Sequence, residues 1–402
     1  MRKALNILLF LAVLTFPLGE IFRIDLGQNI AIRPQDVIAV IIFVFYLILI
    51  LRNKQVNNKY LLRPLIIFSS ICFLSLVLNS SSLTNIQFFV ALSYLIRWIS
   101  YSSIALVING VNKKTKKIYL FTLFIVGLII LALGYVQYFL YPNLRNLYYL
   151  GWDEHNYRMF SVLLDPNFAG AIFVLFFLFL SGTIIFNLIK NQIKNAIVFG
   201  IFSACTLLAI FLTYSRSAIL MLIAGSITFL VLIGKKKYLL ILSGIFIAII
   251  ILLSPTFNKE NTNLFRTASS FARVETYTNS GKIIEDHPIF GIGFNAYRYA
   301  QESYGFRKIQ TRYPSHADAG VDNSFLFVLA TTGLVGFITY LFLWYTILKR
   351  AFDQYRIKKS YISLVVISSS VGLFVDSFFI NSLFFPTIML WMWLLIGLVE
   401  DF

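Results

Sequence analysis

Apolar residues follow one another along this chain in runs that are too long for a soluble fold. Twelve such runs can be placed, each near the roughly 17–25 residues with which a helix crosses a bilayer. A chain in lipid must satisfy its own backbone polar groups, so these runs predict helices. The runs cover residues 4–22, 34–51, 61–78, 86–110, 118–140, 167–188, 194–214, 217–233, 238–254, 322–348, 361–381 and 383–400. We therefore expect an all-α polytopic membrane protein with about 12 transmembrane helices.

Composition agrees with this expectation. The chain has 402 residues, of which 59% are hydrophobic and 13% charged, and these values lie outside the range of soluble domains. One helical bundle accounts for the whole length, so residues 1–402 are expected to form a single domain. Cys72 and Cys205 both fall in apolar runs, which argues against a disulfide framework or a metal site. We expect neither a metal nor a cofactor.

The net charge of +17 is explained by membrane topology. The connectors between the predicted spans fall alternately on the two sides of the membrane. Most Lys and Arg residues lie in the short connectors of one side, which the positive-inside rule identifies as the cytoplasmic side. Both termini are then cytoplasmic. The first apolar run follows Met1-Arg2-Lys3 without a cleavage site of small residues, so it is read as an uncleaved span. Nucleic-acid binding would instead need the charge on one soluble face.

One long polar segment, residues 255–321, connects the ninth and tenth spans and is expected on the outer side. Arg266 and Arg273 are seven residues apart in it, so on a helix they would share a face and could hold a diphosphate. A solvated helix face is the alternative. The segment ends with Arg312, His316 and Asp322. Asp322 has the position of a helix N-cap, and either it or His316 could serve as a general base.

Three other arginines stand out because of their positions. Arg97 lies within a span, where a charge costs about 2.5–3.5 kcal/mol, and is read either as a phosphate or sugar contact or as part of an internal ion pair. Arg158 follows an aromatic segment, residues 141–157, that is typical of a membrane interface. Arg216 lies at the expected start of a helix, where an arginine and free backbone N–H groups could bind one phosphate together.

Several motifs, taken in order, resemble the O-antigen ligase/polymerase family of bacterial membrane glycosyltransferases. The resemblance covers roughly residues 150–350 by motif and the whole chain by layout. The matching segments are DPNFAG at Asp165–Gly170, SRSA at Ser215–Ala218, an arginine helix at Arg273, DHPIFGIGFNAY at Asp286–Tyr297, and TTGLVGF from Thr331.

The resemblance implies a metal-independent transfer of a glycan from a polyprenyl diphosphate carrier, such as undecaprenyl diphosphate, to an acceptor at the outer face of the cytoplasmic membrane. The acceptor would be another lipid-linked glycan in a polymerase, and a lipid core or a protein in a ligase. A chain-length regulator or a flippase could be the protein partner of such an enzyme. The diphosphate contacts are assigned to Arg216, Arg273, Arg266 and Arg97. The other substrate contacts are assigned to Arg158, Arg312, Asn323 and Tyr297.

One position departs from the family pattern. The family typically has histidine-asparagine at the mouth of the span that follows the loop, whereas this chain has Asp322-Asn323. The role of base therefore goes to Asp322 or to His316, and the departure favours a polymerase over a ligase. A lipid-linked sugar transporter or flippase and a non-catalytic assembly subunit remain as alternatives from other functional classes.

Overall fold

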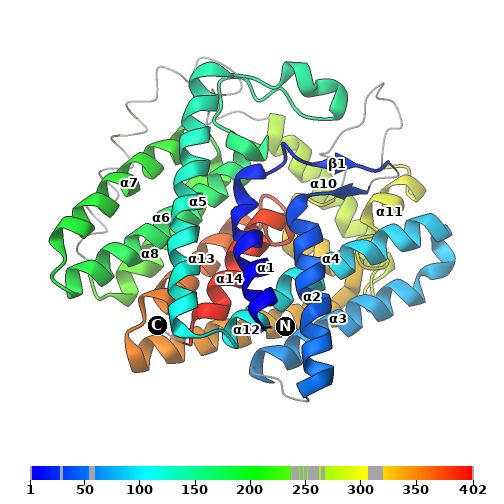
Figure 1. The fold of residues 1–402 in the computed structure, drawn as a ribbon. Coiled ribbons are helices and arrows are strands. Elements are labelled where there is room, and N and C mark those ends of the chain that lie inside the picture. Colours follow the sequence, from blue (N-terminus) through cyan, green and yellow to red (C-terminus); the bar gives the residue numbers. More distant parts are fainter. Residues whose placement is uncertain are drawn as a thin grey trace.

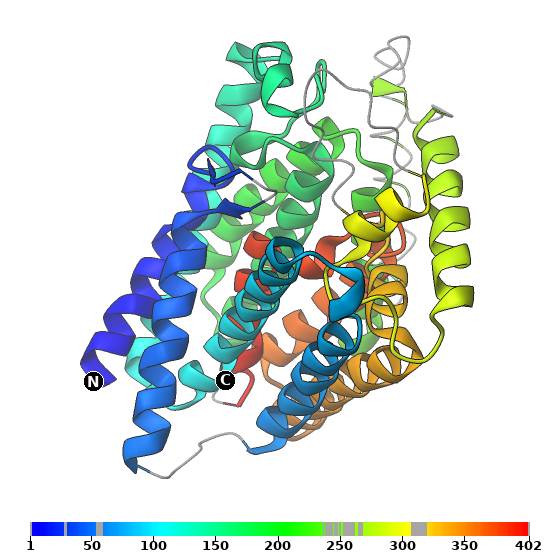
Figure 2. The same ribbon diagram turned by 90° about the vertical axis from the view of Figure 1, so that its right-hand side faces the viewer.

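The computed structural model describes residues 2–27, 30–53, 59–235, 237, 244, 248, 251, 262–263, 268–306 and 320–400. Its helices form one bundle, in which α1 begins and α14 ends on the same side (Figures 1 and 2). The segments that precede α2, α6 and α8 lie on the opposite side (Figure 1).

Helices account for nearly all of the regular structure in the described residues. A pair of two-residue antiparallel strands, β1 (Ile24–Asp25) and β2 (Ala31–Ile32), forms a small hairpin before α2. Short 3-10 helices lie at Phe16–Leu18, Ser80–Ser82, Arg145–Leu150, Ser161–Leu163 and Ser382–Phe384. The α-helices are α1 (Arg2–Leu14), α2 (Pro34–Asn53), α3 (Lys59–Leu78), α4 (Asn85–Asn109), α5 (Lys113–Leu140), α6 (Pro166–Ile189), α7 (Ile193–Leu212), α8 (Arg216–Leu232), α10 (Ala268–Asp286), α11 (Tyr297–Ser303), α12 (Ser324–Lys358), α13 (Tyr361–Asp376) and α14 (Pro386–Leu398).

The expectation of an all-α polytopic membrane protein is confirmed at this level. Within the described residues, seven helices are long and apolar enough to cross a membrane, namely α2 to α7 and α12, and α8, α13 and α14 are shorter apolar helices. The predicted span 4–22 is wrong in its length, because α1 ends at Leu14 and a 3-10 turn with Pro17 follows. The predicted span 238–254 lies largely outside the described residues, and a total of twelve spans remains a prediction.

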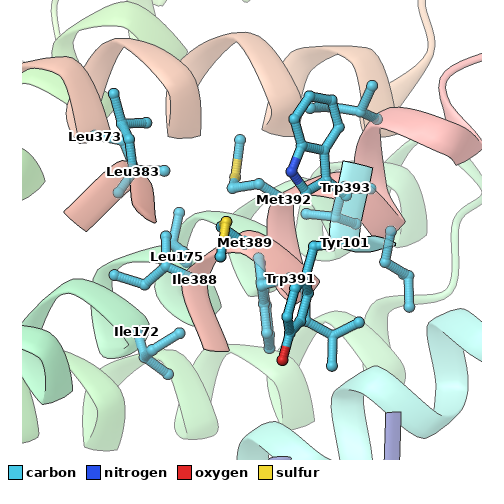
Figure 3. Close-up of a cluster of buried hydrophobic side chains, with 14 of the residues drawn as sticks. Tyr101, Ile172, Leu175, Leu373, Leu383, Ile388, Met389, Trp391, Met392 and Trp393 are labelled. Atoms are coloured by element: carbon cyan, nitrogen blue, oxygen red, sulfur yellow. The ribbon is translucent and has the colours of Figure 1, made fainter. Parts of the chain in front are cut away.

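The centre of the bundle is α14, in which every side chain is buried. A helix that is apolar all round must be surrounded by other helices. Trp391 packs edge-to-face against Phe16, Phe176 and Phe179, with ring centroids 5.9, 6.2 and 6.1 Å apart. Figure 3 shows Trp391 among side chains from α4, α6 and α13.

Small residues allow α6, α8 and α13 to approach one another closely. A Cβ added at Gly170 of α6 would lie 2.6 Å from the Cβ of Ala218 on α8. A Cβ added at Gly372 of α13 would lie 2.9 Å from the Met221 carbonyl oxygen of α8. Close contact through small residues is a general way of associating helices in a membrane. Here it brings the N-termini of α6 and α8 beside the C-terminus of α13.

The long helix α12 is interrupted at Gly333, which has a φ of 64° and a ψ of −170°. The segment after α10 fills this break. The Ile292 and Gly293 N–H groups donate to the Ala330 and Thr331 carbonyl oxygens at 3.1 and 3.0 Å, and the Leu334 N–H donates to the Pro288 carbonyl oxygen at 2.8 Å. Irregular backbone within a membrane protein needs partners of this kind. The turn at Gly291-Ile292-Gly293 thus lies directly against the backbone of α12.

We expect Gly333→Ala to destabilise the protein severely. The positive φ disfavours a side chain, typically by about 1–3 kcal/mol, and a Cβ here would lie 2.2 Å from the Ile289 carbonyl oxygen. The measurement is thermal unfolding of the purified protein in detergent. Gly200→Ala in α7 is the matched control, because no atom lies within 4 Å of the added Cβ. Equal unfolding temperatures for the two variants would contradict this account of the break.

Candidate functional site

The start of α6 and the turn between α7 and α8 are held together by polar contacts. Ser215 is the N-cap of α8, and its hydroxyl donates to the Asn167 side-chain oxygen at 2.9 Å. Arg158 is buried; its Nε donates to the Thr213 carbonyl oxygen at 2.8 Å, and its Nη2 donates to the Asn167 side-chain oxygen at 3.4 Å. The DPNFAG and SRSA motifs therefore meet in space, and Arg158 stabilises their junction.

Arg216 is the first residue of α8, as the sequence predicts. Its side chain is partly exposed, next to the helix N-terminus. The guanidinium groups of Arg216 and Arg273 are close enough to repel each other electrostatically. Two neighbouring guanidinium groups can both make charge-assisted hydrogen bonds to one anion, so this pair is well suited to bind an anionic ligand.

Arg273 reaches this position because α10 docks onto the end of α13. The Tyr277 hydroxyl donates to the Phe378 carbonyl oxygen, and the Arg273 guanidinium lies over the Phe379 ring at 5.8 Å from its centroid. The Asn323 side-chain amide donates to the Tyr277 hydroxyl and to the Phe378 carbonyl oxygen, each at 3.4 Å. Elements that are far apart in sequence, α10, α12 and α13, thus share one polar junction.

Asp322 lies beside Arg273, directly before α12. The expectation that Asp322 caps this helix is wrong: the N-cap is Asn323, whose side-chain oxygen accepts from the Phe325 and Leu326 N–H groups at 2.9 and 3.0 Å. Asp322 is therefore not needed to cap the helix. Burial raises the pKa of Asp322 to about 6, an effect that Arg273 opposes and that the negative charges of Asp165 and Asp153 reinforce. A carboxyl with this pKa suits acid–base chemistry near neutral pH.

Tyr297 is fully buried at the start of α11, and its hydroxyl lies 2.8 Å from the Ser280 hydroxyl of α10. Burial raises the pKa of Tyr297, and the nearby Asp322 carboxylate raises it further. Tyr297 thus adjoins the junction, although its own hydroxyl supports α10. Whether it contacts a substrate remains a prediction.

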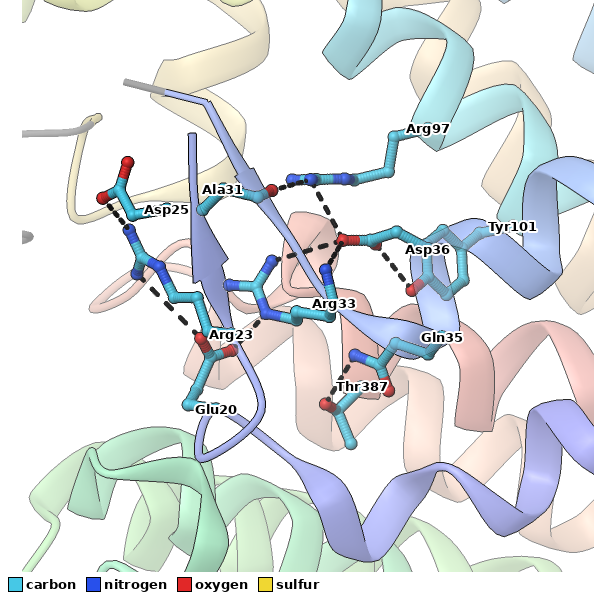
Figure 4. A network of polar contacts seen from close by, with 10 residues as sticks. All are labelled: Glu20, Arg23, Asp25, Ala31, Arg33, Gln35, Asp36, Arg97, Tyr101 and Thr387. Carbon is cyan, nitrogen blue, oxygen red and sulfur yellow. Dashed lines mark hydrogen bonds and ion pairs between the residues drawn. The ribbon is translucent and has the colours of Figure 1, made fainter. Parts of the chain in front are cut away.

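Arg97 lies apart from this junction, in a network that ties the β1–β2 hairpin to α2 and α4 (Figure 4). Its Nη2 lies 3.0 Å from Asp36 Oδ2 and donates to the Ala31 carbonyl oxygen. Arg33 Nε donates to Glu20 at 2.6 Å, and Tyr101 donates to Asp36 at 2.9 Å. Arg97 is therefore part of an internal ion pair, the alternative that the sequence left open, and its assignment to the diphosphate remains a prediction.

Three residues of the predicted site, Arg266, Arg312 and His316, lie outside the described residues. Their assigned roles stay predictions. Helix α10 is described from Ala268 onward, so the helix expected around Arg273 is present, whereas a shared face with Arg266 is not tested.

Sequence reasoning passed over two residues at this junction. His155 Nε2 lies 4.0 Å from Asp165 Oδ2, and Asp165 is the N-cap of α6. Asp376 is fully buried at the C-terminal end of α13 and interacts electrostatically with Arg273. An aspartate within the apolar run 361–381 is itself a signal of function, because carboxylates are rare in membrane spans. No comparable signal in the sequence identified His155.

The candidate site, called the junction here, thus combines Arg216 and Arg273 with the carboxyl groups of Asp322, which is partly buried, and Asp376, which is fully buried. Within the described residues, no group of three or more His, Cys, Asp and Glu side chains is arranged to hold a metal ion.

Residues 201–341 match a family model described as O-antigen ligase. This match supports an assignment to the O-antigen ligase/polymerase family. None of the curated proteins compared with the chain matches it.

The family match spans most of the junction. It runs from within α7 to the first half of α12, and so includes Arg216, Arg273 and Asp322. Asp165 and Asp376 lie outside the matched range, although the fold brings both close enough to Asp322 or Arg273 to interact with them electrostatically. The membrane-spanning helices and the family match together indicate a glycosyltransferase-type activity.

We expect the stability of the protein to respond to Asp322→Asn in a pH-dependent way. The pKa of Asp322 is raised in the folded protein from 3.8 to about 6. The carboxyl is therefore neutral in both states below about pH 4, and its ionisation destabilises the folded state increasingly as the pH rises from about 4 to about 6. Above that range the variant should be more stable than the parent by roughly 2–4 kcal/mol.

Unfolding in detergent at several pH values measures this difference. Glu154→Gln is the control, because Glu154 is exposed and its pKa is lowered by hydrogen bonds from Asn156 and Arg145. A stabilisation by Asp322→Asn that persists at about pH 4 would contradict the assigned titration.

Proposed function

We propose that this protein transfers a glycan from a polyprenyl diphosphate carrier to an acceptor hydroxyl, and that it acts as a polysaccharide polymerase of the O-antigen type. The observation that carries the proposal is the convergence of Arg216 and Arg273 at a junction that also holds Asp322. Diphosphate is the leaving group of such a transfer, and a pair of guanidinium groups stabilises the charge that develops on it.

The transfer requires one base and no external reductant or oxidant. The acceptor hydroxyl oxygen attacks the anomeric carbon of the donor glycan, and the bond between that carbon and the diphosphate oxygen breaks. The electron pair leaves with the polyprenyl diphosphate, next to Arg216 and Arg273. The hydroxyl proton passes to Asp322, whose pKa of about 6 leaves the carboxyl mostly ionised near neutral pH.

The polymerase assignment rests on Asp322, which stands where the family typically has a histidine. A ligase with a lipid-core or protein acceptor is the second candidate, and the description of the matched family model, O-antigen ligase, favours it. The two candidates share the donor and differ only in the acceptor. They can therefore be separated by which acceptor is consumed.

The proposed setting is the outer face of the bacterial cytoplasmic membrane. The junction lies on the side of the bundle opposite to the start of α1 and the end of α14 (Figures 1 and 2). The connectors on the side of those ends carry the lysine clusters that the positive-inside rule places in the cytoplasm. A carrier with an apolar tail could then lie in the bilayer while its diphosphate reaches the arginines. A chain-length regulator, or a flippase that supplies the donor, is the protein partner that we propose for this role.

We expect Arg216→Ala and Arg273→Ala each to reduce glycan transfer by about 10²–10³-fold, the usual effect of removing one group that stabilises the developing charge. The assay uses purified protein, a lipid-diphosphate-linked oligosaccharide and no added metal, with products resolved by gel and mass. Arg145→Ala is the control, because Arg145 is exposed on the same side and pairs only with Glu154 in the described structure. Parental rates in both variants would refute the diphosphate assignment.

Asp322→Ala should abolish turnover without preventing donor binding, because the base acts on the acceptor. In the parent protein, the rate should fall as the pH drops below about 6, since protonation removes the base. The pH dependence of kcat measures this effect. A variant that retains both the parental rate and the acid limb would exclude Asp322 as the base and move the role to His316 or another group.

A further inference from the structure

Asp376 has an environment that disfavours a carboxylate in three ways. It is 0% exposed. It is the last residue of α13, where the helix dipole is negative and repels an anion. In the described structure, neither of its carboxylate oxygens has a hydrogen bond of normal geometry. A buried charge normally has a strong partner, so this residue requires an explanation.

The hydroxyl groups beside Asp376 each lie within hydrogen-bond distance of another serine hydroxyl. Ser217 and Ser382 both lie beside the carboxylate. The Ser217 hydroxyl, however, lies 3.2 Å from the Ser215 hydroxyl, and the Ser382 hydroxyl lies 2.8 Å from that of Ser377. The Ser217 and Ser382 hydroxyls therefore compensate only in part for the burial of the Asp376 carboxylate.

The cation that faces Asp376 is Arg273. Helix α10 is fastened to the chain directly after Asp376, since Tyr277 donates to the Phe378 carbonyl oxygen and Arg273 lies over the Phe379 ring. Arg273 and Asp376 interact electrostatically across this contact. Ser217, beside Asp376, directly follows Arg216, so Asp376 contacts the first turn of the helix that carries Arg216.

We propose that Asp376 is the internal counter-charge of Arg273 in the Arg216–Arg273 pair, and that it competes with the diphosphate for Arg273 and thereby promotes release of the polyprenyl diphosphate product. This inference rests on the proposed function. It assigns Asp376 as a positioning residue: being fully buried, it acts through the arginines and does not contact the donor.

The physical reason is a balance of charge. With the site empty, Asp376 offsets the repulsion between the two guanidinium groups. A bound diphosphate brings its own negative charge to the same groups, so Asp376 then opposes it, and the opposition weakens binding of donor and product alike. An enzyme that must release a diphosphate after every transfer gains turnover from this weaker binding. Asp322 cannot substitute, because the proposed transfer changes its protonation.

The test is Asp376→Asn, which removes the charge and keeps the shape. We expect the variant to bind farnesyl diphosphate, a soluble stand-in for the product, about tenfold more tightly, which corresponds to roughly 1.4 kcal/mol. The KM for the lipid-linked donor and kcat should both fall. In an Arg273→Ala background the same substitution should change the affinity little, because the counter-charge acts through Arg273. A purely structural role would weaken binding in both backgrounds.

Ser369→Ala is the matched control, since Ser369 is buried in the same helix and its hydroxyl has no partner within the described structure. Unchanged or weaker farnesyl diphosphate binding by Asp376→Asn would overturn the inference. If that variant does not fold, Asp376→Ser removes the same charge; failure of both to fold while Ser369→Ala folds would also overturn it. A parent protein that binds no prenyl diphosphate would instead refute the proposed function.

Discussion

The fold depends on one constraint: polar groups that leave water must find partners inside an apolar bundle. The break in α12 at Gly333 illustrates it, because the freed backbone groups pair with residues 288–293. This pairing fixes the chain that follows α10 against α12. Helix α10 carries Arg273, and Asp322 directly precedes Asn323, the N-cap of α12. Arg273 and Asp322 interact electrostatically between these two joined elements.

The same constraint distinguishes two groups of charged residues. Around Arg97, cations and carboxylates alternate, and ion pairs and hydrogen bonds join them into one network, which suits a structural tie (Figure 4). Around Arg273 the arrangement differs. The like charges of Arg216 and Arg273 lie near each other, and Asp376 is buried without a hydrogen bond of normal geometry in the described structure. Such an arrangement leaves interaction energy available for a ligand. The contrast supports the placement of the diphosphate at Arg216 and Arg273 rather than at Arg97.

The candidate site lies at the ends of helices, and the helices give it rigidity. Asp165, Ser215 and Asn323 cap α6, α8 and α12, and their caps satisfy the backbone N–H groups there. Arg216 and Asp322, which lie next to the caps Ser215 and Asn323, are therefore not needed to satisfy these N–H groups. Close packing at Gly170 and Gly372 sets the distances between the helices. A proposed reaction that needs cations and a base at defined positions can use such a frame.

The sequence by itself determined the membrane helices, because apolar runs of this length have few alternatives in lipid. It also identified Arg216 at a helix start, where Ser215 is the cap residue. It could not separate Asp322 from Asn323 as the cap, since both residue types serve there. Only the tertiary structure decided that Arg97 pairs with Asp36, and that His155 approaches Asp165. It also decided that Asp376 interacts with Arg273. These contacts join residues far apart in the chain, and the packing of α6, α8, α10 and α13, which no local pattern encodes, creates them.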